Sequence, residues 1–175
     1  LFSDDQEIPG IEMNTGALGH GLSIGVGMAL AGKMDEAAYR VFTLLGAGEL
    51  AEGSKWEAAM AAAHFNAGNL VAILDYNKFQ ETGPISREIA LEPLVEKWQS
   101  FGWTVHEVNG HDLEEVLAKF QLVKQLEATG KPQMIIAHTI KGKGVSFVEA
   151  DFTFHGRALN EAQAESAREE LNAAR

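Results

Sequence analysis

The stretch that decides the fold is RVFTLLGAGELAEGSKWEAAMAAAHFNAGNLVAILDYN, residues 40–77. An apolar, β-branched run at residues 39–45 overlaps its start, and a second run at residues 70–74 lies near its end. Gly46 and Gly48 follow the first run, and an alanine-rich helical pattern follows them. Strand, glycine turn, helix and strand in this order predict a βαβ unit with parallel strands.

The same alternation continues along the chain. Residues 133–140 form a third apolar run and residues 103–108 a weaker fourth, while residues 90–101 have the apolar spacing of a helix. We expect the first three runs to be strands buried on both faces, as in a parallel sheet. The predicted fold class is therefore α/β, a doubly wound and mainly parallel sheet, with residues 1–175 forming a single domain.

Helical side-chain patterns predict buried faces and helix ends. In residues 55–66 the apolar side chains share one stripe that we expect to face the core. They are Trp56, Ala59, Met60 and Ala63. Asp112, followed three residues later by Glu115, is typical of an N-terminal capping pair. Residues 160–175 are polar and rich in alanine and glutamate, which predicts an exposed helix.

The segment before residue 40 is a helical pattern with many glycines. Each interior glycine of residues 16–32 costs about 1 kcal/mol relative to alanine. A sequence that tolerates this cost needs the backbone to approach a ligand or another helix closely. We expect phosphate contact at the helix start, whereas helix packing and ligand contact are equal alternatives further along. The first group is Gly16, Gly19 and Gly21, and the second is Gly25 and Gly27.

Composition excludes several classes of function. The 25 acidic residues outnumber the 14 Lys and Arg, giving a formal net charge of −11, which argues against nucleic acid and anionic membranes as partners. The chain has no cysteine for a disulfide or a thiolate metal site. Residues 17–31, the most apolar run, fall short of the about 20 residues of a membrane span, and no signal peptide precedes them. We expect a cytoplasmic protein, and the polar start of the chain indicates a fragment or a naturally shortened protein.

The glycine turn fits two kinds of site. Gly46, Gly48 and Ala51 satisfy the G-x-G-x-x-A pattern of a dinucleotide site, with Asp75 where a ribose-binding acid would lie. Two features count against this interpretation: Glu49 and Glu52 place carboxylates in the loop meant for a pyrophosphate, and the turn does not open a helix at once. The alternative is a metal–diphosphate site.

The metal–diphosphate alternative depends on where parallel strands end. Because the carboxyl ends of adjacent parallel strands meet at one sheet edge, we expect Gly46 and Gly48 to lie beside Asn77. Glycine amides there bind phosphate, and Mg²⁺ accepts side-chain and main-chain oxygens.

These residues resemble the cofactor motif of transketolases, which is Gly-Asp-Gly followed after about thirty residues by Asn. The flanking sequence is also similar between residues 8 and 160, in the segments TGALGHG (15–21), LEPL (91–94), GHD (110–112) and KGKGVSF (141–147). Many such motifs in one order are specific to the family, and the similarity is greatest to the N-terminal subunit of split-gene transketolases. The resemblance implies the thiamine diphosphate-binding fold, with thiamine diphosphate and Mg²⁺ or Ca²⁺ as cofactors.

The resemblance assigns roles to individual positions. The diphosphate site comprises Gly16, Leu18, Gly19, Gly46, Ala47, Gly48 and Asn77. Asn77 is expected to ligate the metal through its amide oxygen, and Phe79 through its main-chain carbonyl. Glu52 matches a buried carboxylate that links two active sites across the dimer, with a solvated loop glutamate as the alternative. His155 is the remaining histidine of a His-x-x-His-Gly motif, in which Phe152 replaces the first.

Ala47 stands where the family has its metal-binding aspartate. A methyl group cannot coordinate Mg²⁺, and water and a rotated Glu49 are the alternatives for the vacant ligand position. We expect cofactor binding to be weakened but not necessarily lost. The family's upstream region has no counterpart here, and neither does the glutamate that activates the cofactor.

The resemblance also implies partners. We expect a pyrimidine-binding C-terminal transketolase subunit, a homodimer or heterotetramer, and sugar phosphate substrates that exchange a two-carbon ketol unit. Two alternatives remain open: a non-catalytic, cofactor-poor binding or assembly subunit, and, remotely, an NAD-binding oxidoreductase domain.

Overall fold

A four-stranded parallel sheet forms the centre of the molecule in the computed structural model, which describes residues 9–126 and 129–173. The strand order is β1-β2-β6-β5, and all three neighbouring pairs are parallel. The strands are β1 (Val41–Gly46), β2 (Leu70–Tyr76), β5 (Thr104–Asn109) and β6 (Gln133–His138). The predicted α/β fold is confirmed, and all four expected strands are present.

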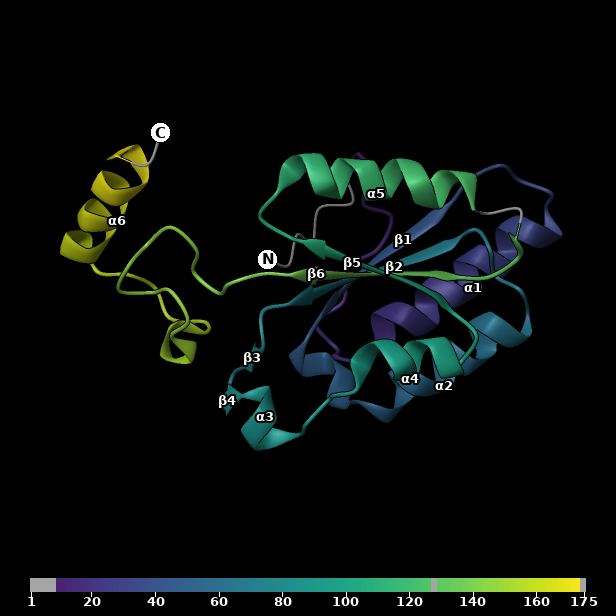
Figure 1. Ribbon diagram of the computed structural model, residues 1–175, viewed down its shortest axis with the longest axis horizontal. Helices are drawn as coiled ribbons and strands as arrows, with labels where there is room; N and C mark the ends of the chain where they lie inside the picture. The colour runs from purple at the N-terminus through teal and green to yellow at the C-terminus, as the bar shows by residue number, and fades with distance from the viewer. Residues whose placement is uncertain (1–8, 127–128, 174–175) are drawn as a thin grey trace.

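Helices cover the two faces of the sheet unequally (Figure 1). Three helices pack below it in this view: α1 (His20–Met34), α2 (Gly53–His64) and α4 (Leu94–Ser100). The other face carries α5 (Leu113–Gln125) alone among the described helices. Helices on both faces make the sheet doubly wound, as expected. Within residues 9–126 and 129–173, no helix is long and apolar enough to cross a membrane.

Short elements surround the carboxyl ends of the strands, at the left of Figure 1. They are η1 (Gly48–Ala51), β3 (Phe79–Gln80), β4 (Gly83–Pro84), α3 (Ile85–Glu88) and η3 (Phe152–Phe154). The last helix, α6 (Glu161–Ala173), lies apart from the sheet and is largely exposed, as its polar sequence predicts.

Burial of the strands differs from the prediction at β1. The first three residues of β2 and the first four of β6 are buried without alternation, whereas β1 alternates along its length. Phe42 and Leu44 are 45% and 73% exposed, although the Phe42 ring still meets Phe120 of α5 edge to face, with 6.0 Å between the ring centroids. The prediction that β1 is buried on both faces is therefore wrong.

The buried face of α2 also differs from the predicted stripe. The buried residues are Lys55, Ala58, Ala59 and Ala62. Met60 is instead 50% exposed, so the stripe is rotated by about one residue position. The rotation brings a lysine into the interior, where α2 packs against α1.

The predicted cap of α5 is confirmed, whereas α1 and α4 begin about four residues later than predicted. The Asp112 carboxylate accepts hydrogen bonds from the amides of Glu114 and Glu115 and so caps α5. The glycine-rich helix begins at His20 rather than at residue 16, so that the first glycines form a loop. Gly25 lies against β1, where an added Cβ would overlap the Thr43 hydroxyl. Close helix–sheet packing thus explains Gly25.

Candidate functional site

The turn after β1 and the end of β2 lie at the same edge of the sheet. Gly46 pairs in register with Asp75, two residues before Asn77. The turn also approaches β3, because a Cβ added to Gly48 would lie 2.8 Å from the Cβ of Gln80. Residues 46–49, Asn77 and β3 therefore form one corner, which we call the glycine corner. A side chain at Gly48 would not fit there, whereas a Cβ on Gly46 would meet nothing within 4 Å.

The N-terminus of α1 belongs to the same corner. Gly19 is the N-cap residue and has φ of 91°, a conformation that favours glycine. The Ser54 hydroxyl donates a hydrogen bond of 3.0 Å to the Gly19 carbonyl. A Cβ on Gly19 would lie 2.6 Å from Ser54 Oγ and 2.8 Å from Glu52 Cβ. The start of α2 thus fixes the glycine loop against the turn that follows β1.

The Glu49 carboxylate joins the two glycine segments. Its Oε1 accepts a hydrogen bond of 3.0 Å from the amide of Gly46. Its Oε2 accepts one of 3.2 Å from the amide of Gly19 and lies 3.2 Å from Nζ of Lys55. α1 has no side-chain cap at its N-cap residue, so the Glu49 carboxylate supplies the negative charge that a helix N-terminus favours.

Lys55 is an internal cation beneath this corner. Its side chain is wholly buried and pairs with Glu49, which is 14% exposed. Burial lowers the pKa of the Lys55 ammonium, and the negative charge of Glu49 opposes this shift. Beyond this ion pair, Nζ has no hydrogen-bond partner within the described part of the chain. A Cβ on Gly21 would lie 3.8 Å from Nζ, so the ammonium also lies near the first turn of α1.

The part that Glu49 and Lys55 play together was not predicted from the sequence. From the sequence, Glu49 counted against a dinucleotide site and as a substitute metal ligand, not as the partner of a lysine, and Lys55 lay outside the predicted stripe of α2. A signal for Lys55 was present, because Lys55, Ala58, Ala59 and Ala62 have the i, i+3, i+4, i+7 spacing of a buried helix face.

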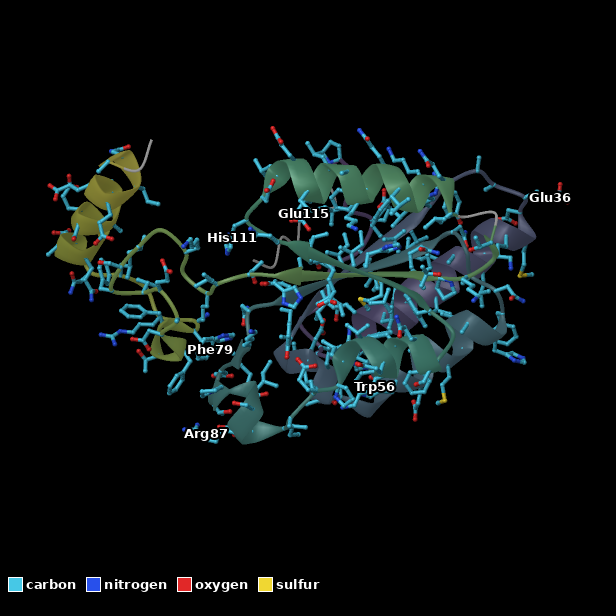
Figure 2. The ribbon with its side chains drawn as sticks, in the orientation of Figure 1. Glu36, Trp56, Phe79, Arg87, His111 and Glu115 are labelled. Atoms are coloured by element: carbon cyan, nitrogen blue, oxygen red, sulfur yellow. The ribbon has the colours of Figure 1, made fainter. Side chains whose placement is uncertain are left out.

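The predicted metal ligands lie next to each other. The Asn77 Oδ1 accepts a hydrogen bond of 2.9 Å from the amide of Phe79, and its Nδ2 donates one of 3.3 Å to Asp75. Asp75 also accepts a hydrogen bond from the Thr139 hydroxyl. Figure 2 shows Phe79 at the carboxyl edge of the sheet. The oxygen proposed as a ligand therefore faces a backbone amide.

The side chains present do not fit a magnesium site. Ala47 is 1% exposed and packs in the core with Leu50, and its methyl group offers no oxygen. Residues 9–126 and 129–173 contain no group of three His, Asp or Glu side chains placed to hold a metal ion. Mg²⁺ requires near-octahedral oxygen ligands. The corner offers the Asn77 amide oxygen, main-chain carbonyls and the Glu49 carboxylate, which is already bound to two backbone amides and Lys55.

The remaining predicted residues surround the corner at different distances. Gly16 and Leu18 lie in the exposed loop before α1, with Leu18 61% exposed. Glu52 is exposed at the N-cap of α2, beside Gly19. His155 is exposed after η3, which contacts β4. No hydrogen bond within the described residues joins His155 to the corner.

A parallel α/β sheet with glycine turns and a helix N-terminus at its carboxyl edge is the arrangement typical of α/β domains that bind phosphate groups. The family model described as the transketolase, thiamine diphosphate binding domain matches residues 3–174. The chain belongs to this family, which favours the thiamine diphosphate interpretation of the turn over the dinucleotide interpretation.

Curated relatives include proteins named as transketolase subunits. An apulose-4-phosphate transketolase subunit from Phocaeicola vulgatus is 46% identical over 166 residues, which cover 95% of this chain and 58% of the relative. The 6-deoxy-6-sulfo-D-fructose transketolase subunit SqwG of a Clostridium species is 44% identical over 168 residues, which cover 96% of this chain and 60% of the relative. The chain thus spans less than two thirds of the length of these relatives.

Solved structures agree with the fold. The transketolase of Campylobacter jejuni superimposes with a TM-score of 0.86 at 30% identity, over 93% of this chain and 26% of that one. A Pichia stipitis transketolase in complex with sedoheptulose 7-phosphate gives a TM-score of 0.84 at 29% identity, over 95% of this chain and 26% of that one. Both cover nearly all of this chain with a small part of their own.

Proposed function

We propose that this chain binds the diphosphate end of thiamine diphosphate in a split transketolase that transfers a two-carbon ketol unit between sugar phosphates. One observation carries the proposal: Gly46 in register with Asp75, with the N-terminus of α1 tied to the same turn through Glu49. Backbone amides and a helix N-terminus at one point are what a diphosphate group needs. The bound cofactor would supply the chemistry of breaking and forming the carbon–carbon bond.

The residues of the glycine corner then have separate tasks. The amides of Gly46 and Gly19 bind phosphate oxygens, and Gly48 keeps the turn close to β3. Gly16 and Leu18, in the loop before α1, contact the cofactor where the diphosphate joins the thiazolium ring. Asn77 orients the diphosphate through its amide group, while its role as a metal ligand, with the carbonyl of Phe79, is weak because Ala47 provides no oxygen.

A partner completes the proposed enzyme. The curated relatives are named as subunits, and this chain spans about 58% of the length of the first of them. We propose that the partner is a pyrimidine-binding C-terminal transketolase subunit, in a homodimer or heterotetramer. The exposed Glu52 at the start of α2 is available for contact across that interface. The exposed His155 would contact the sugar phosphate near the mouth of the site.

Ala47 favours a second candidate, a binding or assembly subunit that retains the fold with little cofactor. Its methyl group is buried in the core, and the Glu49 carboxylate occupies the amides that a phosphate would use. This candidate predicts association with the partner without tight binding of thiamine diphosphate.

Calorimetric titration of the chain with thiamine diphosphate and with thiamine separates the two candidates. The proposed function predicts saturable binding of thiamine diphosphate. Thiamine, which lacks the diphosphate, should bind at least about tenfold more weakly, a difference of about 1.4 kcal/mol in binding free energy. Equal or absent binding of both compounds, together with partner association in size-exclusion chromatography, would support the assembly subunit. Ketol transfer by the reconstituted pair then tests the enzymatic part.

A further inference from the structure

The glycine corner contains an anion site that the chain fills with its own carboxylate. We propose that Lys55 replaces the divalent cation, so that its ammonium and the amides of Gly19 and Gly46 bind a diphosphate group without metal once Glu49 swings out. The inference rests on the proposed function and extends it to the source of positive charge.

The contacts of Glu49 define the site. The Glu49 carboxylate accepts hydrogen bonds from two backbone amides, at 3.0 Å from Gly46 and 3.2 Å from Gly19, and forms an ion pair with the Lys55 ammonium at 3.2 Å. A phosphate oxygen pair accepts hydrogen bonds from the same kinds of donor, and charge-assisted hydrogen bonds of this kind are about twice as strong as neutral ones. The N-terminus of α1 adds its favourable dipole. Glu49 thus occupies the place that a phosphate group would take.

The Lys55 ammonium has N–H donors that no acceptor satisfies within the described residues. An ammonium carries three N–H donors. The Lys55 side chain is wholly buried, and among the described residues its Nζ makes only the ion pair with Glu49. A buried charge is destabilising unless it is paired and hydrogen-bonded. A diphosphate offers several anionic acceptors where Glu49 offers two oxygens, so the exchange satisfies more of the donors of Lys55.

Lys55 can bring the same net positive charge to the corner as a metal held by one carboxylate. A magnesium ion held by one carboxylate would bring a net charge of +1, as +2 − 1. Lys55 brings +1 by itself when Glu49 has left, and Ala47 contributes no charge. Lys55 therefore supplies the same net charge in the interior, where electrostatic interactions are screened less than in water.

Glu49 has a way out of the site. It lies in the short 3₁₀ turn η1 (Gly48–Ala51), and its side chain is 14% exposed rather than sealed in the core. The neighbouring Gly46 faces open space, because a Cβ there would meet nothing within 4 Å. Rotation of the side chain toward solvent removes the like charge that would otherwise repel a diphosphate.

The test is calorimetric titration with inorganic pyrophosphate and with thiamine diphosphate, in EDTA and in excess Mg²⁺. We expect the dissociation constants of the unmodified chain to agree within about twofold between the two conditions. Lys55→Met should weaken binding by at least about tenfold, since a hydrogen bond to a charged group contributes about 1.5–3 kcal/mol. Glu49→Gln should tighten binding, because it removes the competing charge. Glu57→Gln, on the exposed side of α2, changes the net charge equally and should leave binding unchanged.

The outcomes separate this inference from the proposed function. Magnesium-dependent binding of thiamine diphosphate that Lys55→Met leaves intact would overturn the inference and keep the function. No binding of either compound in either condition would overturn both. If Lys55→Met alone fails to fold, Glu49→Gln is compared with the double variant Glu49→Gln/Lys55→Met, which removes both buried charges. The double variant should bind at least about tenfold more weakly, and equal affinity would refute the role of Lys55.

Discussion

Replacing Ala47 with aspartate probes the glycine corner most informatively. Ala47 is 1% exposed and packs among apolar core residues. An unpaired carboxylate there loses its hydration, and Glu49 already adds a negative charge two residues away. We expect a loss of about 2–3 kcal/mol in the free energy of unfolding in EDTA. For a chain of 175 residues, at about 2–4 °C per kcal/mol, Tm should fall by about 4–12 °C.

Magnesium should reverse part of this loss. An aspartate at this position restores an anionic oxygen beside Asn77, so Mg²⁺ with thiamine diphosphate should raise the Tm of Ala47→Asp more than that of the unmodified chain. Calorimetric titration should likewise give magnesium-dependent thiamine diphosphate binding in the variant. Ala47→Asn is the matched control, because it has a similar volume without the charge and should gain much less from Mg²⁺.

Two results would refute this reasoning. An unchanged Tm for Ala47→Asp in EDTA would mean that the side chain at position 47 is not buried. An equal response of the aspartate and asparagine variants to Mg²⁺ would mean that no cation binds between this turn and Asn77.

Three further changes test the structure around the site. Gly19→Ala should lower the free energy of unfolding in urea by at least about 2 kcal/mol, because φ of 91° is strained for alanine and the Cβ overlaps α2. Gly27→Ala, at an open and exposed position, should instead raise it by about 0.5–1 kcal/mol. Equal effects would contradict the packing described. Tyr76→Phe removes a 2.6 Å hydrogen bond that lowers the pKa of Glu92. The lowered pKa of Glu92 stabilises the folded state at pH values above its unfolded pKa of about 4.5, and this contribution is lost as pH falls through the folded pKa. The difference in free energy of unfolding between the unmodified chain and Tyr76→Phe should therefore shrink between pH 7 and pH 3. A constant difference would be evidence against this role of the hydrogen bond. Asp112→Ala should cost about 1 kcal/mol and lower the helical circular dichroism signal on heating, because α5 loses its cap, and an unchanged Tm would exclude that role.

The features predicted correctly have local signals in the sequence. The continuous apolar runs of β2 and β6 indicated a buried parallel sheet, and Asp112 indicated the start of α5. The shared edge of the Gly46 turn and Asn77 followed from the topology of a βαβ unit, because parallel neighbours end at the same side.

The features that were missed depend on distant parts of the fold. An apolar run is the same whether or not a helix covers its second face, so the exposure of Phe42 and Leu44 on β1 could not be predicted. Lysine in a helix is usually exposed, so the spacing of Lys55 with the buried alanines of α2 was a weak signal, and the packing of α2 against α1 decides that Lys55 is internal. Its partner Glu49 contacts Gly19 across 30 positions of sequence, which no local pattern indicates.

The most direct test of the diphosphate site is an NMR titration of the ¹⁵N-labelled chain with thiamine diphosphate and, separately, with thiamine. The proposed site predicts saturable changes at the backbone amides of Gly19 and Gly46 with thiamine diphosphate and none of that size with thiamine. Saturable changes confined to amides far from the carboxyl edge of the sheet, with those two unmoved, would contradict it.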